Sequence, residues 1–182
     1  GLVLLEAYSL ELLRELAAQM EQRLSLVNLD DITFADKPLI DQIGKDTNDA
    51  IRLLATAGIN DAYLYVRKPS ELSDGQRYRF RLAKAIETGA QVWVADEFLA
   101  VLDRTSAKVI AFSLQKTARR MGATVLVATT HTDMVDDLYP DLRIEKRYRE
   151  KVLVEALEGA AARAKAATLT REEINELLLK AL

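Results

Sequence analysis

The 182-residue chain contains no cysteine and a single histidine. Without cysteine it can form no disulfide bond, no zinc–thiolate site and no thiol nucleophile. Because no secretory signal pattern opens the chain either, a reducing, cytoplasmic compartment is expected. With His131 alone, a histidine cluster for a metal is excluded, and a Ser–His–Asp triad would have to use this residue. Gly1 in place of methionine is typical of a processed or engineered piece.

Chain-breaking residues and long apolar runs are also scarce. The chain has 7 glycines and 3 prolines, below the roughly 12% share of an average globular chain, which favours helices. No run approaches the about 20 apolar residues of a membrane-spanning helix. The 25 basic and 28 acidic residues give a net charge of −3, which argues against the overall electrostatic footprint of a nucleic-acid-binding protein and leaves local basic patches open.

Strand-like and helix-like segments alternate along the first 130 residues. Apolar runs predict strands at the following places: residues 2–5, 24–29, 91–95 and 123–129. Periodic apolar positions with capping residues predict helices from Ser9, from Asp46 to Gly58, at 73–88 and at 105–120. The first thirty residues fit a βαβ unit, and 61–66 is ambiguous. The alternation predicts an α/β fold with a parallel sheet and right-handed crossover helices.

After Arg143 the composition changes and the sheet pattern is expected to end. A basic run extends to Lys151, and residues 160–167 are rich in alanine, arginine and lysine. Thr170 to Glu173 form a capping box, and apolar residues continue on one face to Leu182. An amphipathic C-terminal helix is therefore expected, as a cover for the sheet, a dimerisation element or designed sequence.

Three short segments could carry chemistry. Ser73, Gly75 and Gln76 open the helix at 73–88, where free N–H groups and the helix dipole favour a phosphate, although Ser-x-x-Gln is also an ordinary capping box. Asp96 and Glu97 end a buried strand, at the edge where open α/β sheets bind ligands; solvated acids would look the same. His131 follows the next strand, as a phosphate or water ligand or as an ordinary loop residue.

The order and spacing of these segments resemble the second half of an ABC-type ATPase domain, from about Lys37 to Lys151. LSDGQRYRFRLAKAI is similar to the family's LSGGQ signature, with Asp74 in place of a glycine, and VWVADE to its Walker B motif. The resemblance implies a partial ABC ATPase fold of the P-loop-NTPase type, with ATP and Mg²⁺ as cofactors. The segment from PLIDQIG to RKPSELSDGQRYRFRLAKAI looks like soluble ABC ATPases described as fused to a predicted acetyltransferase domain.

The resemblance also implies roles for single residues. Asp96 would stand on the Mg²⁺ side, and Glu97 and His131 would be catalytic, as the Walker B carboxylate and the switch histidine of VLVATTH. The signature residues Ser73, Gly75 and Gln76, together with Asp103 of the D-loop, would contact nucleotide.

One family motif is missing from the chain. No G-x-x-x-x-G-K-[ST] loop occurs, and Glu6-Ala7-Tyr8-Ser9 stands where that Walker A loop would cradle the phosphates. Phosphate binding by this chain alone is therefore doubtful. In the family the signature acts on a nucleotide held by a partner's Walker A, so a homo- or heterodimer through the signature and D-loop face is implied.

The sequence thus predicts four regions: a strand–helix–strand unit without a P-loop at 1–36, a helical signature region at 37–90, a core from Walker B to the switch at 91–152, and a linker and helix at 153–182. Two functions stay open. The chain is either part of an ATPase that is inactive alone, or a non-catalytic, truncated or engineered scaffold that keeps the half-fold. Nucleic-acid association through Arg77, Arg79, Arg81 and the 143–151 run is a third, unsupported possibility.

Overall fold

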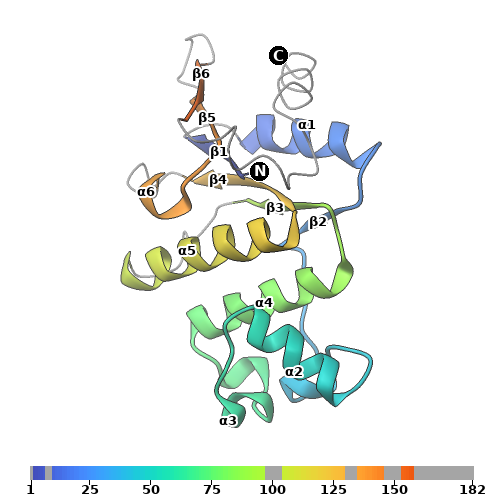
Figure 1. The fold of residues 1–182 in the computed structure, drawn as a ribbon. Coiled ribbons are helices and arrows are strands. Elements are labelled where there is room, and N and C mark those ends of the chain that lie inside the picture. The colour runs from blue at the N-terminus through green and yellow to red at the C-terminus, as the bar shows by residue number, and fades with distance from the viewer. Residues whose placement is uncertain (1, 7–9, 97–103, 130–134, 146–152, 158–182) are drawn as a thin grey trace.

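The computed structural model describes residues 2–6, 10–96, 104–129, 135–145 and 153–157. Glu97, Asp103, His131 and the predicted C-terminal helix lie outside these ranges. Six strands form one sheet, in the order β2-β3-β4-β1-β5-β6 (Figure 1). The strands are β1 (Leu2–Glu6), β2 (Leu26–Asn28), β3 (Val92–Ala95), β4 (Thr124–Thr129), β5 (Leu142–Glu145) and β6 (Leu153–Ala156). The pairs from β2 to β5 are all parallel, and β6 joins β5 in the antiparallel direction.

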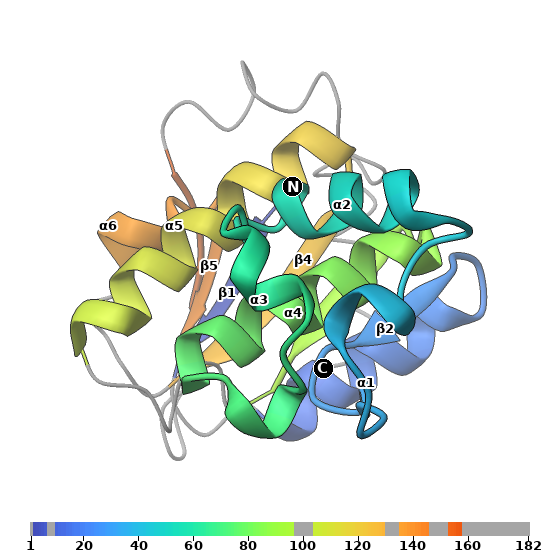
Figure 2. The ribbon, with the colours of Figure 1, turned by 90° about the horizontal axis from the view of Figure 1, so that it is seen from below.

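Helices lie on both faces of this sheet. They are α1 (Leu10–Glu21), α2 (Thr47–Thr56), α3 (Ala62–Tyr65), α4 (Asp74–Thr88), α5 (Arg104–Met121) and α6 (Val135–Leu138), with 3₁₀ turns at Leu39–Asp41 and Pro69–Glu71. In Figure 1, α1 lies above the sheet and α5 and α4 below it. Figure 2 shows α2, α3 and α4 together on the lower side of the molecule. No helix among the described residues combines the length and apolar character that crossing a membrane requires.

Two hydrophobic cores follow from the alternation of side chains along the strands. Val92 and Val94 of β3 point to the α1 side, where they join Leu13. Trp93 and Ala95 point to the opposite side, into the larger core that contains the buried residues of α2, α4 and α5. Because helices cover both faces, all four residues of β3 are buried. This is why the strand reads as a continuous apolar run in the sequence.

The local predictions hold for most elements. Asp46 caps α2 by accepting a hydrogen bond from the Asp49 N–H, and Gly89 ends α4 in the left-handed conformation, at φ 66°. The ambiguous segment 61–66 contains the short helix α3. β1 and β2 are parallel, as a βαβ unit requires, but β3 and β4 lie between them.

The expectation that the sheet pattern ends after Arg143 is wrong. β5 pairs with β1, and β6 extends the sheet within a segment predicted as linker. β5 has only four residues, of which Leu142 and Ile144 are buried while the alternate residues are partly exposed. Such a short alternation between charged side chains carries little signal in a sequence. The strand is stabilised by its long-range pairing with β1.

Gly44 and Gly89 both have positive φ, but they should tolerate alanine differently. A Cβ on Gly44 would lie 2.5 Å from the backbone nitrogen of Ala50, whereas one on Gly89 would meet no described atom within 4 Å. Both substitutions incur the left-handed backbone penalty of about 1 kcal/mol, and Gly44→Ala adds overpacking of about 1–3 kcal/mol. Urea unfolding should show Gly44→Ala to be clearly the less stable variant. Equal losses for the two variants would contradict the packing around Gly44.

Candidate functional site

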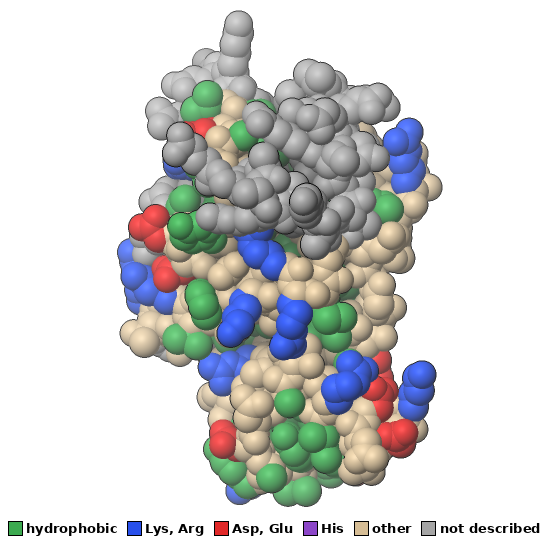
Figure 3. All heavy atoms as spheres, in the orientation of Figure 1, with side chains coloured by type: hydrophobic (Ala, Val, Ile, Leu, Met, Phe, Trp, Pro, Cys, Tyr) green, Lys and Arg blue, Asp and Glu red, His purple; other side chains and the backbone are tan. Residues whose placement is uncertain are grey.

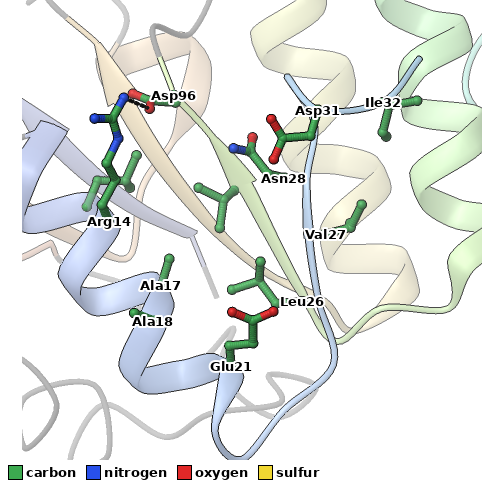
Figure 4. A pocket seen from close by; sticks show the side chains of 12 residues that line it. Arg14, Ala17, Ala18, Glu21, Leu26, Val27, Asn28, Asp31, Ile32 and Asp96 are labelled. Atoms are coloured by element: carbon green, nitrogen blue, oxygen red, sulfur yellow. Dashed lines mark hydrogen bonds and ion pairs between the residues drawn. The ribbon is translucent and has the colours of Figure 1, made fainter. Parts of the chain in front are cut away.

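Asp96 lies at the carboxyl end of β3, where its carboxylate meets a cation from α1. The Arg14 Nη2 donates to Asp96 Oδ2 at 3.2 Å (Figure 4). The Asp96 side chain is only 14% exposed, and that of Arg14 is 72% exposed. Asp96 Oδ1 is buried and has no hydrogen-bond partner within the described part of the chain. A buried acceptor of this kind has lost its water without compensation, so it is suited to a bound water or ion.

A second carboxylate, Asp30, stands beside Asp96 because β2 and β3 are parallel neighbours and end at the same edge. The Asp96 backbone N–H donates to Asp30 Oδ2 at 2.8 Å. Arg81 of α4 lies on the other side of Asp30, with Nη1 3.7 Å from Oδ1. The residues Arg14, Asp96, Asp30 and Arg81 thus form a ladder from α1 to α4, in which an arginine at each end flanks the two neighbouring carboxylates.

Burial and neighbouring charges shift the pKa values of Asp30 and Tyr78, which both lie near Arg81. Partial burial raises the pKa of Asp30, against the opposing effects of the Asp96 N–H and the Arg81 charge. The Arg81 guanidinium carbon also lies 5.8 Å from the Phe34 ring centre and 5.9 Å from that of Tyr78, within the range of cation–π attraction. Burial raises the pKa of the Tyr78 hydroxyl, so Tyr78 stays neutral beside this arginine.

An open pocket of about 440 Å³ adjoins the Arg14–Asp96 pair, between α1 and the β2 edge of the sheet. Figure 4 shows Ala17 and Ala18 on α1 facing Leu26 of β2 across this space. Asn28 and Asp31 carry polar groups at the Asp96 end. The small alanine side chains leave the gap, and the polar groups concentrate where the parallel strands end.

The signature segment forms the capping box that its sequence predicts. The Gln76 N–H donates to Ser73 Oγ at 3.3 Å, and the Ser73 N–H donates to Gln76 Oε1 at 3.0 Å. These bonds engage the side chains of both residues in the start of α4. Gly75 is different, because a Cβ there would meet no described atom within 4 Å and its φ is not positive. Neither packing nor backbone conformation within the described structure requires glycine at this position.

A second pocket, of about 260 Å³, opens where the first turns of α4 and α5 meet. It is lined by the N-cap Ser73 and the α4 residues Gly75, Gln76 and Arg79, and by Thr105, Ser106, Val109 and Ile110 of α5. Hydroxyl groups, an arginine and two helix N-termini are a donor-rich environment for an anion. This pocket shares no lining residue with the pocket beside Asp96. The signature residues and Asp96 therefore face separate spaces.

Sequence reasoning missed Arg14 and Asp30. Asp30 had a signal, because Asp30-Asp31 ends an apolar run just as Asp96-Glu97 does, and parallel strands bring such ends together. Arg14 had none, since only the packing of α1 places it at Asp96. Gln42 is not part of this site, because its side chain holds the loop before it. Its Nε2 donates to the Lys37 carbonyl at 2.7 Å, and its Oε1 accepts from the Ala35 N–H at 3.0 Å.

Mg²⁺ fits Asp96 as one carboxylate donor. The described residues hold no group of three or more His, Cys, Asp or Glu side chains that could form a metal cage. Mg²⁺ is commonly bound by one or two carboxylates, several waters and the phosphates of a substrate, so a single aspartate with a free buried oxygen suits it. Arg14 already neutralises part of the charge of Asp96, which lowers the attraction for a second cation.

Solved structures with the same arrangement of sheet and helices confirm the predicted fold class. The structure of cbiO1 from Clostridium perfringens, part of the ABC transporter complex cbiONQ, matches 98% of this chain and 83% of that chain, with a TM-score of 0.66 and 15% identity. A dimeric, post-hydrolysis ATP-binding cassette, MJ0796 bound to ADP and Pi, matches 87% of this chain and 85% of that chain, with a TM-score of 0.62 and 15% identity. The fold is that of an ABC ATPase domain.

The family follows from the sequence. The family model described as ABC transporter matches residues 5–100, more than half of the chain, and the chain belongs to this family. The methionine import ATP-binding protein MetN 3 of Pectobacterium atrosepticum is 32% identical over 93 residues. That match covers 51% of this chain and 26% of the relative, so the chain corresponds to about a quarter of the length of this curated protein.

Proposed function

We propose that this chain contributes signature, Walker B and switch elements to ATP binding and hydrolysis at a dimer interface with a partner that carries Walker A, and that it hydrolyses ATP negligibly alone. The observation that supports the proposal is the separation of the two pockets. Ser73 and Gly75 line one, and Asp96 borders the other. In a dimer, the first would meet the partner's nucleotide, and the second would belong to this chain's own incomplete site.

Each residue has a defined task in this proposal. The Ser73 hydroxyl and the N–H groups at the start of α4 donate hydrogen bonds to the terminal phosphate of the partner's ATP, and Asp103 contacts the partner near it. At this chain's own site, Asp96 Oδ1 would hold Mg²⁺ directly or through water. Glu97 would orient the attacking water and accept its proton, and the His131 imidazole would hydrogen-bond the terminal phosphate of a nucleotide whose phosphate loop comes from elsewhere. Mg²⁺, when bound, neutralises charge on the phosphates.

A non-catalytic scaffold is the second candidate, and the Arg14–Asp96 pair favours it. Arg14 Nη2 lies 3.2 Å from the Asp96 carboxylate, so the charge that would attract a metal ion already has a counterion. The sequence also lacks a Walker A motif. In this case the sheet and α4 would serve packing or dimerisation, without bound nucleotide.

Calorimetric titration of the purified chain with Mg-ATP, with a phosphate-release assay beside it, tests the inactivity of the chain alone. We expect millimolar or weaker binding and no release above background, and Glu97→Gln should match the unsubstituted chain. A clear ATPase rate that falls in Glu97→Gln would contradict the dependence on a partner. Micromolar binding without hydrolysis would exclude the scaffold and show that other residues replace Walker A.

A further inference from the structure

The outward face of α5 carries a regular row of cations. The helix has five basic residues and no acidic one in its 18 residues, although the whole chain has a net charge of −3. Every fourth residue from the start of the helix is exposed and is either basic or aromatic. These residues form the row Arg104, Lys108, Phe112, Lys116 and Arg120. In Figure 3, Lys and Arg side chains gather over the middle of the molecule, where α5 and α4 lie.

The packing of the fold accounts for only part of this positive charge. Arg119 is the inward member, since its Nη1 lies 3.1 Å from Asp141 Oδ2. Lys108 has one distant counterion, Asp137 of α6, with Nζ–Oδ2 at 3.9 Å. Arg120 Nη2 donates to the carbonyl of Thr56 at 3.3 Å. Lys116 has no ion pair or hydrogen bond among the residues that the structure describes, so its charge is directed to solvent.

An exposed aromatic ring interrupts the row at its centre. Phe112 is 54% exposed, and Val109, one turn before it, is 45% exposed. Side chains four positions apart on a helix are about 6 Å apart, so Lys108 and Lys116 flank the ring on either side. A ring between cations suits a polyanion whose charges alternate with flat apolar groups. The phosphates and bases of nucleic acid have this pattern, whereas a lipid headgroup layer offers no stacking group and an acidic protein surface has no regular alternation of charges and flat rings.

We propose that the exposed row on α5 binds a nucleic acid, with its four basic residues on phosphates and Phe112 stacked on a base where the strand is single. The helix is about 27 Å long, enough to follow several nucleotides. Apart from Val109, which also lines the pocket at the signature segment, this surface consists of residues outside the proposed ATP site. The nucleic-acid proposal can therefore be tested separately from the proposed function.

Fluorescence anisotropy with a labelled 20-nucleotide single strand and a 20-base-pair duplex, from 50 to 200 mM NaCl, tests the proposal. Four phosphate contacts predict a slope of about −3 for log K against log salt on the single strand, an affinity loss of about 50-fold over this range. Lys108→Gln/Lys116→Gln should bring the slope to about −1.4. Phe112→Ala should weaken single-strand binding about 5-fold or more and leave duplex binding unchanged.

Two control variants test whether binding depends on the place of the positive charges on α5 or on the net charge of the chain. Lys37→Gln/Lys45→Gln removes the same charge from exposed residues outside α5 and should bind as the unsubstituted chain does. Lys108→Arg/Lys116→Arg should retain binding and exclude loss of folding as the cause. No binding at 50 mM NaCl, equal weakening by both Gln pairs, or α5-dependent binding to phosphatidylserine vesicles or polyglutamate without binding to nucleic acid would each overturn the proposal.

Discussion

Replacing Trp93 with alanine should lower the free energy of unfolding by about 3–5 kcal/mol. Trp93 is the largest of the fully buried side chains, at 1% exposure, and stands on β3 opposite Val125 of β4. Its indole N–H donates to the Ala90 carbonyl at 3.1 Å. Alanine would leave a cavity below the sheet and an unpaired carbonyl. Urea unfolding followed by far-UV circular dichroism measures the loss.

Trp93→Phe is the matched control for this substitution. Phenylalanine keeps an aromatic ring in the core but cannot donate to Ala90, so it should lose less than half as much stability as Trp93→Ala. If Trp93→Ala unfolded within about 1 kcal/mol of the unsubstituted chain, Trp93 could not occupy the centre of the larger core.

Gly75→Leu should weaken ATP-dependent association with a Walker-A-bearing partner strongly while leaving the isolated chain folded. Within the described structure a Cβ on Gly75 meets nothing within 4 Å, so the larger side chain projects into free space. In the proposed dimer that space holds the partner's nucleotide, and leucine would keep the start of α4 from the phosphate. Sedimentation velocity should show association weakened by about 10-fold or more.

Ala55→Leu supplies the control for Gly75→Leu. Ala55 is exposed on α2, so this variant adds similar apolar bulk to the solvent-facing side of another helix, outside the signature pocket. It should associate as the unsubstituted chain does. Thermal unfolding of both variants within about 1 kcal/mol of the starting protein would assign any difference to the interface. Unchanged association of Gly75→Leu would remove the signature from the proposed site.

The elements that could be predicted from the sequence are those that depend on local residue patterns. The buried run at β3 and the caps of α2 and α4 were identified because each depends on a few consecutive residues. β5 and β6 were missed, since their stability comes from pairing with strands far away in the chain. The fold class followed from the alternation of strands and helices, and it is confirmed.

In the candidate site too, the features that depend on consecutive residues were predicted, and those that depend on tertiary packing were not. Asp96 was identified from its place after a buried strand, and Ser73 and Gln76 form the predicted capping box. The pairing of Arg14 with Asp96 and of Asp30 with Arg81 depends on three-dimensional packing between α1, the sheet and α4. No spacing rule links residues 82 positions apart. The roles of Ser73, Gly75 and Asp96 toward nucleotide stay predictions, as do those of Glu97, Asp103 and His131.

Sedimentation velocity of this chain, mixed in turn with each Walker-A-bearing ABC domain of its source organism, tests most directly whether the chain completes an ATP site. The partner should carry glutamine at its Walker B glutamate, so that bound ATP is not consumed. A faster-sedimenting complex should form with at least one partner, and only when Mg-ATP is present. Profiles that are the same with and without Mg-ATP for every partner would contradict it and leave the scaffold as the function of the chain.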